Sequence, residues 1–146
     1  MLTVGGTATP TMRDRLLTDH RRLELLFTHV LDAFDADARE DCQQYWAMLE
    51  NGLERHFTAE ERYIFPSFMK FDPAETRALR EDHDIIRSKM AELGVGVELK
   101  LVRAELAHRF IQALREHAAR EDQLLYRWID EHPSVMTRQL LQHLDT

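Results

Sequence analysis

The spacing of apolar residues is the sequence feature that most restricts the fold of this chain. Four long segments repeat apolar residues every three or four positions, as amphipathic α-helices do, and none alternates with the period of two typical of strands. We expect helices over residues 12–34, 40–65, 73–93 and 97–130. A short fifth helix is expected from Pro133. Pro66 should end or kink the second helix, and Gly94 and Gly96 should close the third.

Four helices with short connections predict an all-α fold, an antiparallel up-down-up-down four-helix bundle. With 146 residues, the chain is long enough for one domain with a core that needs no disulfide. We expect residues 11–146 to form this bundle domain, including the short extra C-terminal helix. Residues 1–10 are expected to be a flexible N-terminal arm.

Composition excludes several classes of function. The single Cys42 rules out an intramolecular disulfide and a cluster of thiolate metal ligands, and it suits a reducing compartment. The first residues lack the basic and apolar regions of a secretory signal, and no apolar stretch is long enough to span a membrane. A net charge of −7 without a basic cluster makes nucleic acid a poor candidate partner. We therefore expect a soluble cytoplasmic protein.

Two sequence motifs each occur twice, in the same order. HFTAEERYIF (residues 56–65) and HAAREDQLLY (residues 117–126) share the pattern H-x-x-x-E-[ED]-x-x-[IL]-[FY]. LLTDH (residues 16–20) and LREDH (residues 79–83) share L-x-x-D-H. The chain therefore consists of two similar helical hairpins. Closing them with pseudo-twofold symmetry would bring four histidines near the bundle axis: His20, His56, His83 and His117.

The repeated motifs predict a metal site inside the bundle. Residues four positions apart share a helix face, so each His-x-x-x-Glu pair points in one direction. All of the repeated histidines and glutamates fall on apolar stripes, where uncompensated charges and imidazoles are costly. Two divalent cations would compensate them, because imidazole suits Fe, Zn or Cu and carboxylates can bridge two ions. The candidate ligands are His20, His56, Glu60, His83, His117 and Glu121.

Simpler interpretations apply to single residues of this kind. A lone histidine on an apolar stripe is usually a hydrogen-bonded core residue, and a lone His-Glu pair is usually a surface pair. A complete set repeated in order favours metal binding instead. The remaining histidines lie off the stripes or near the C-terminus and are expected to be solvated: His29, His108, His132 and His143.

Three acidic residues lie close to the candidate ligands in the sequence. Glu24 follows His20 by four positions, but its counterpart in the second hairpin is Arg87, so we expect a surface residue. Asp19 and Asp82 each precede a candidate ligand and point about 100° away from it on the helix. They are expected to be solvated, the alternative being that each accepts the second N–H of a histidine on an adjacent helix.

The stretch HFTAEERYIFP resembles the H-x-x-x-E-E-x-x-L-F-P motif of the haemerythrin-like (HHE cation-binding) family, and the resemblance extends over about residues 12–130. It implies a four-helix bundle with a non-haem di-iron centre, bridged by Glu60, Glu121 and an oxo or hydroxo group. It also implies that one iron is bound by His20 and His56. The other would be bound by His83 and His117. Nitrogen and oxygen ligands also admit Zn or Mn.

The chain departs from the oxygen-carrying members of that family. Arg87 stands where the carriers have a further histidine, and Glu121, at spacing four, stands where they have aspartate at spacing five. The ligand set is closer to bacterial relatives implicated in sensing, nitric oxide responses and repair of iron-sulfur centres. The expected function is binding of O2 or NO in sensing, scavenging or a redox response.

Two alternatives to this function stay open. One is a di-iron redox enzyme of the iron-centre repair type, which turnover with an electron donor would distinguish. The other is iron storage, which is disfavoured because that class has Glu-x-x-His at spacing three. Neither enzymatic activity nor a protein partner follows from the sequence.

Overall fold

The computed structural model describes residues 12–132, and every regular element within this range is helical. The predicted all-α class is therefore confirmed for this part of the chain. The expected N-terminal arm and the helix from Pro133 lie outside the described residues. The elements are α1 (Met12–Asp35), α2 (Arg39–Ala59), the π-helix η1 (Glu60–Ile64), α3 (Phe65–Phe71), α4 (Pro73–Glu98), α5 (Ala104–Arg120), the π-helix η2 (Glu121–Tyr126) and α6 (Arg127–Glu131).

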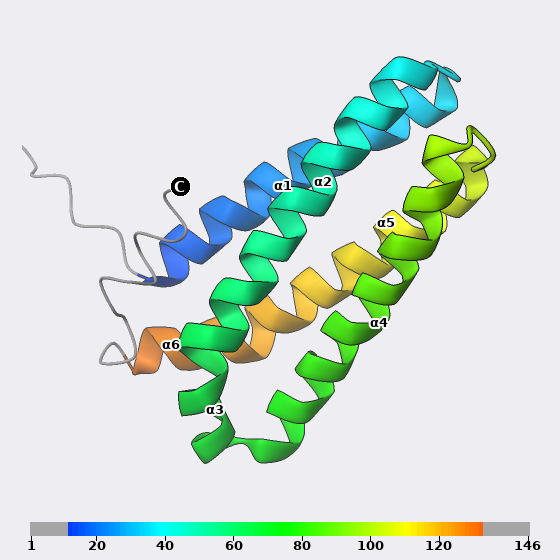
Figure 1. Cartoon of the computed structure of the whole chain (residues 1–146). Helices are drawn as coiled ribbons and strands as arrows, with labels where there is room; N and C mark the ends of the chain where they lie inside the picture. Colours follow the sequence, from blue (N-terminus) through cyan, green and yellow to red (C-terminus); the bar gives the residue numbers. More distant parts are fainter. Residues whose placement is uncertain (1–11, 133–146) are drawn as a thin grey trace, which may run out of the picture.

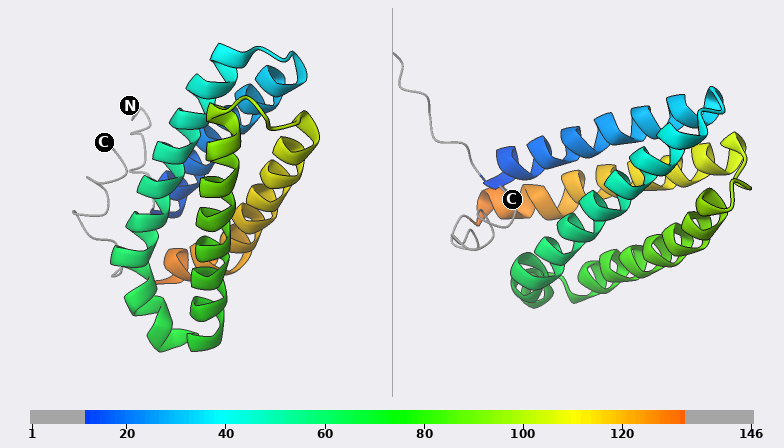
Figure 2. Two further views of the ribbon diagram at one scale, coloured as in Figure 1. Left: turned by 45° about the vertical axis from the view of Figure 1, so that its right-hand side comes forward. Right: turned by 45° about the horizontal axis from the view of Figure 1, so that its top comes forward.

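The four long helices lie side by side (Figure 1). Helix α1 packs against α2 and α5, and α4 packs against the same two helices. Figures 1 and 2 show that the α1–α2 and α4–α5 connections share one end of the molecule, with the α3–α4 connection at the other. At the shared end, Asp37 and Lys100 adopt positive φ angles of 52° and 59° in the two connections. Asp72 caps α4 at the other end, accepting a hydrogen bond of 3.0 Å from the backbone N–H of Glu75.

Two predicted helix limits are wrong at the α4–α5 connection. Helix α4 runs to Glu98, beyond the two glycines expected to end it, and α5 begins only at Ala104. The glycines serve close packing instead. A Cβ atom on Gly96 would lie 2.6 Å from Cγ2 of Val102, and one on Gly94 would lie 3.2 Å from Nε1 of Trp46.

The helix that begins with α2 continues past Pro66 instead of ending there. The backbone N–H of Phe65 donates to the carbonyl of Glu60, five residues back, so that one π-type turn precedes the proline. Helix α3 then extends to Phe71, with Pro66 in its first turn. Proline is tolerated in the first turn of a helix.

The apolar core consists of two clusters. The larger cluster includes Leu23, Phe27, Val30, Leu31, Phe34, Trp46, Leu49, Leu53, Phe57, Ile86, Met90, Phe110, Ile111 and Leu114. The smaller cluster consists of Leu16, Ala59, Ile64, Phe65, Phe68, Leu79, Leu125, Tyr126, Trp128 and Ile129.

A layer of polar residues separates the two clusters. On α1, His20 lies between Leu16 of the smaller cluster and Leu23 of the larger one. The other three repeated histidines occupy the same place on their helices: His56, His83 and His117. The sequence repeat therefore produces one layer that crosses the whole bundle.

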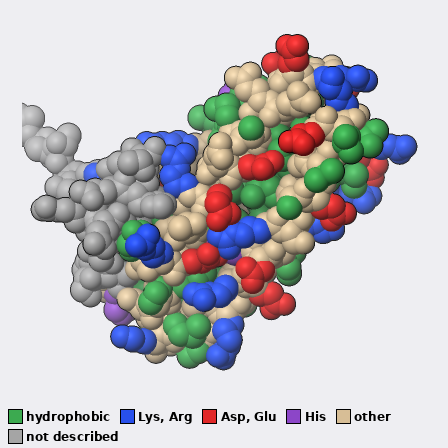
Figure 3. Space-filling view, in the orientation of Figure 1, with side chains coloured by type: hydrophobic (Ala, Val, Ile, Leu, Met, Phe, Trp, Pro, Cys, Tyr) green, Lys and Arg blue, Asp and Glu red, His purple; other side chains and the backbone are tan. Residues whose placement is uncertain are grey.

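Charged side chains of both signs are interspersed on the face of the bundle shown in Figure 3. Surface pairs include Arg109 with Glu105, whose Nη2 and Oε1 atoms are 2.7 Å apart. None of the helices within residues 12–132 combines the length and apolar character needed to cross a membrane.

Candidate metal centre

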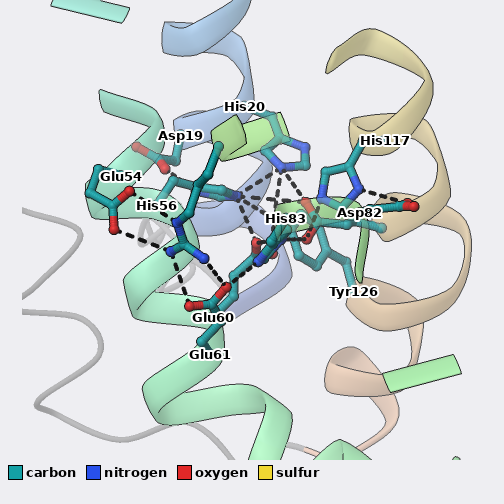
Figure 4. A network of polar contacts seen from close by, with 12 residues as sticks. Asp19, His20, Glu54, His56, Glu60, Glu61, Asp82, His83, His117 and Tyr126 are labelled. Atoms are coloured by element: carbon teal, nitrogen blue, oxygen red, sulfur yellow. Dashed lines mark hydrogen bonds and ion pairs between the residues drawn. The ribbon is translucent and has the colours of Figure 1, made fainter. Parts of the chain in front are cut away.

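The six candidate ligands meet in the polar layer. Figure 4 labels all of them except Glu121. They form two overlapping groups, and within each group every residue offers one ligand atom that lies within 4.8 Å of those of the others. One group contains His20 and His56, and the other contains His83 and His117. Glu60 and Glu121 belong to both groups. Five of the six residues are buried, and the side chain of His20 is 12% exposed.

Glu121 is oriented between the two histidine pairs. Its Oε1 atom lies 3.3 Å from Nε2 of His20 and 3.8 Å from Nε2 of His56. Its Oε2 atom lies 3.4 Å from Nε2 of His83 and 3.2 Å from Nε2 of His117. Each carboxylate oxygen therefore faces one pair, which is the orientation that a carboxylate shared by two cations requires.

Glu60 lies beside both pairs as well. Its Oε1 atom is 3.5 Å from Nε2 of His56 and 3.3 Å from Nε2 of His83. This oxygen has no hydrogen-bond partner despite its burial, and the same holds for Oε1 of Glu121 and Nε2 of His117. Buried polar atoms without partners cost free energy. Because all three face the same centre, which is rich in imidazole and carboxylate, the site fits divalent cations.

Three of the imidazole rings form a hydrogen bond, through the nitrogen that faces away from the centre, with a carboxylate outside it. Nδ1–H of His56 donates to Oδ2 of Asp19 on the adjacent helix, and Nδ1–H of His117 donates to Oδ2 of Asp82 at 3.1 Å. The expectation that these aspartates are solvated is thus wrong, and the alternative is confirmed. In the neutral ring, an Nδ1–H donor leaves Nε2 as the acceptor that faces the centre.

His83 is held by a carboxylate that sequence reasoning missed. Its Nδ1–H donates to Oε2 of Glu61 at 2.7 Å. Arg87 donates to the same oxygen through Nη1 at 2.7 Å and to Oε2 of Glu54 through Nε at 3.0 Å. The sequence signal that could have identified Glu61 is its place in the repeated motif, where an acidic residue directly follows the glutamate of the His-x-x-x-Glu pair. The sequence identified Arg87 only as the residue that replaces a ligating histidine. In the structure it holds Glu61, the carboxylate that orients His83.

Tyr126 was also missed by sequence reasoning. Its Oη–H donates to Oε2 of Glu60 at 2.8 Å, and Oη lies 2.7 Å from Nε2 of His20 and 2.9 Å from Nε2 of His56. Burial, followed by the nearby carboxylates of Glu121 and Glu60, raises the pKa of Tyr126 well above its usual range. The phenol is therefore protonated in the metal-free protein and acts as a donor.

Both π-helices begin at the glutamates of the centre, η1 at Glu60 and η2 at Glu121. In an uninterrupted α-helix, a residue nine positions after a histidine would lie about 180° away from it. A π-turn accommodates one extra residue, which reduces this angle to about 80°. Phe65 and Tyr126, the ninth residues after His56 and His117, are thereby turned towards the polar layer. Phe65 stacks on His83 with ring centroids 5.2 Å apart.

A small cavity of about 20 Å³ adjoins the polar layer. Its polar wall is formed by the imidazoles of His20, His56 and His117 together with Glu121. The rest of its wall is formed by Leu23, Phe27, Leu53, Phe57, Leu114 and Ala118, most of them from the larger cluster. A cavity of this volume holds about one water-sized molecule.

The other residues singled out in the sequence lie away from the centre. Glu24 is exposed and pairs with Arg115, with Oε1 and Nη2 2.7 Å apart. His108 is exposed and pairs with Asp35 at 2.9 Å. His29 and His132 are also exposed, as expected, and His143 lies outside the described residues.

Ionisation of the metal-free centre should give it a characteristic pH dependence. Burial alone would lower the pKa of His83, but the carboxylates of Glu121, Glu60 and Glu61 close to its ring outweigh this effect and raise the pKa to about 11. Burial alone would raise the pKa of Glu61, but His83 and Arg87 lower it to about 2.

We therefore expect the metal-free protein to be most stable between about pH 4.5 and 6.5, the ordinary pKa values of the two groups. The contribution of Glu61 is lost as pH falls towards 2, and that of His83 is lost as pH rises towards 11. Metal binding requires neutral imidazoles, so the gain in stability on adding metal should grow with pH. Melting temperatures across pH, with and without metal, test this. A metal-free melting temperature that rises steadily above pH 6.5 would contradict it.

The helical bundle and its buried histidine–carboxylate layer define an all-α protein with a built cation site. A family model, the Hemerythrin HHE cation binding domain, matches residues 11–134. The chain belongs to this family, as the sequence motifs predicted. Comparisons with curated proteins and with solved structures gave no match.

Proposed function

We propose that this protein is a di-iron protein that binds O2 or NO and acts in sensing, scavenging or a redox response. The observation that carries the proposal is a carboxylate pair shared between two histidine pairs, beside a cavity of about 20 Å³. In this proposal Glu60 and Glu121 bridge the ions within an up-down-up-down bundle. One ion is held by His20 and His56, and the other by His83 and His117.

The chain's own residues prepare the centre for cations. Asp19, Asp82 and Glu61 fix the rings of three histidines, so that the Nε2 atoms are directed inwards before a cation arrives. When bound, two ferrous ions would supply electrons and coordination positions for a diatomic ligand. Zn or Mn could be held by the same donors, and metal analysis separates these cases. A reducing cytoplasmic setting suits a ferrous centre and the free thiol of Cys42.

The size of the cavity favours a diatomic ligand over an organic substrate. Sites for drug-sized organic molecules usually have volumes of about 300–1,000 Å³. The cavity beside the centre has about 20 Å³ and a largely apolar wall, so O2 or NO fits it and a larger substrate does not. This supports ligand binding more strongly than it supports conversion of an organic compound.

The decisive experiment is anaerobic loading with Fe²⁺, followed by metal analysis and spectra before and after adding O2 or NO. We expect about two irons per chain, matching the two ligand groups. NO should give a stable adduct. O2 should oxidise the reduced protein without a long-lived adduct, because Arg87 stands where the oxygen carriers have a ligating histidine and, paired with Glu61 and Glu54, leaves that coordination position open. A chain that binds no metal would be a structural bundle, and a reversible oxygen adduct would indicate oxygen carriage.

Filling the cavity should slow ligand entry without removing metal. Ala118→Val adds two methyl groups to the cavity wall, and we expect NO association to slow severalfold at unchanged iron content. Ala119→Val is the matched control, because this neighbouring alanine is exposed and lies outside the cavity wall. Stopped-flow mixing with NO measures the rates. Equal rates in both variants would show that ligands reach the centre by another route.

A further inference from the structure

The side chain of Tyr126 is part of the core, but its hydroxyl oxygen lies where a metal-ligating atom would lie. It forms a triangle with Nε2 of His20 and Nε2 of His56, with sides of 2.7, 2.9 and 3.1 Å. Glu60 contributes a fourth atom, Oε2, 2.8 Å from the hydroxyl oxygen. The side chain is fully buried at 0% exposure, so the hydroxyl has no access to bulk water.

The sides of this triangle match the spacing of donor atoms around a single metal ion. Nitrogen and oxygen donors bind transition metals at about 2.0–2.2 Å. Two donors at such distances and at right angles to each other are therefore about 3 Å apart. Tyr126, His20 and His56 thus have the mutual distances of three adjacent ligands.

The two halves of the molecule differ at this position. The first copy of the motif ends in Phe65, which stacks on His83 and has no hydroxyl. The second copy ends in Tyr126, whose ring centroid lies 4.8 Å from that of His20. Both rings follow a π-turn and lie beside a histidine of the layer, but only Tyr126 carries a hydroxyl.

We propose that Tyr126 is a further metal ligand, bound through its phenolate oxygen to the ion held by His20 and His56. This proposal rests on the metal centre of the proposed function. On coordination the O–H bond breaks, an oxygen–metal bond forms, and the proton is released to the buffer as the metal binds. The ion held by His83 and His117 has no such ligand, so the two ions differ.

This ligand does not obstruct the cavity. Tyr126 belongs to the smaller cluster, whereas the apolar wall of the cavity is formed mainly by the larger cluster on the other side of the polar layer. A diatomic molecule therefore enters from the face opposite Tyr126. We infer that the tyrosine occupies a position at the first ion and leaves the cavity side of the centre free.

The test uses the visible and resonance Raman spectra of the full chain loaded with iron and oxidised. We expect a tyrosinate-to-Fe³⁺ charge-transfer band, with phenolate ring modes enhanced by excitation within it. Tyr126→Phe should keep its iron, because the six histidine and glutamate ligands remain, and should lose the band completely. Tyr45→Phe is the control and should keep it, because that ring stacks on His29, away from the centre.

A measurement on the unaltered chain covers the case in which the variant does not fold. Growth with ring-deuterated tyrosine should shift the enhanced modes if they arise from tyrosinate. Two bound irons without such a band would overturn the role of Tyr126 while leaving the metal centre intact. A band that survives in Tyr126→Phe would also overturn it. A chain that binds no iron would overturn the proposed function and this ligand together.

Discussion

His117→Ala is expected to lower metal content and thermal stability together. The side chain of His117 is 5% exposed, and its Nε2 atom lies 3.2 Å from Oε2 of Glu121. Removing the imidazole deletes a ligand and leaves a buried carboxylate with less compensation, since His117 is the main group that lowers the pKa of Glu121 against the effect of burial. Breaking a buried pair in this way costs about 3–5 kcal/mol. The ring also packs edge-on against Phe57, with centroids 5.7 Å apart, so packing is lost as well.

The measurements are iron per chain after anaerobic loading and the melting temperature with and without metal. His108→Ala on the same helix is the control. Its imidazole is 48% exposed and pairs with Asp35 at the surface, where such pairs contribute about 0–1 kcal/mol. We expect this control to retain full metal content. If His117→Ala retained full metal content and an unchanged melting temperature, His117 would not be a ligand.

Asp19→Asn is expected to weaken metal binding by about 10–100-fold while leaving the fold intact. Asp19 accepts the Nδ1–H of His56 and thereby directs Nε2 of that ring into the centre. The amide of asparagine can still accept a hydrogen bond, but it lacks the negative charge that strengthens the bond and the basicity of the ring. Asp82→Asn should have a smaller effect, because Asp82 is 32% exposed and its bond to His117 is longer, at 3.1 Å.

Competition with a chelator of known affinity measures these changes, and far-ultraviolet circular dichroism confirms the fold. Asp32→Asn is the control, because this aspartate is exposed on the same helix as Asp19, away from the polar layer. Complete loss of metal in Asp19→Asn would mean that the aspartate is itself a ligand. Unchanged affinity in both variants would remove the orienting role.

The sequence was sufficient to predict the four long helices and the six histidine and glutamate residues that gather in the polar layer. A histidine and a glutamate four positions apart share a face whatever the packing of the helix, so His56 with Glu60 and His117 with Glu121 could be paired directly. The hydrogen-bond partners of the histidine rings could not be predicted in this way. Asp19 does point away from His20, but the rotation of α2 brings His56 to it, and only the packed bundle fixes that rotation.

The two π-turns explain a further difference between sequence and structure. In an ideal α-helix, Leu124, three positions after Glu121, would lie on the same face as this buried glutamate. Leu124 is 47% exposed instead, whereas Leu125 and Tyr126 are fully buried. Periodicity assumes a constant rotation per residue, and η2 changes that rotation at the metal centre itself. For this reason Tyr126 could not be placed beside the histidines from the sequence.

The π-turns also make the length of the chain between motif positions a determinant of the site. Deleting one residue from η2 would remove the extra residue that the π-turn accommodates. The segment could then form an uninterrupted α-helix in which the tyrosine, now the eighth residue after His117, keeps its angle of about 80°. The His-x-x-x-Glu pair would survive such a deletion, and the residues after η2 would keep their faces. Deleting a second residue would rotate them by about 100°, so that the tyrosine would leave the centre and Trp128 would leave the smaller cluster. In relatives of this chain, the number of residues separating the glutamate from the aromatic position is therefore as informative as the identity of either residue.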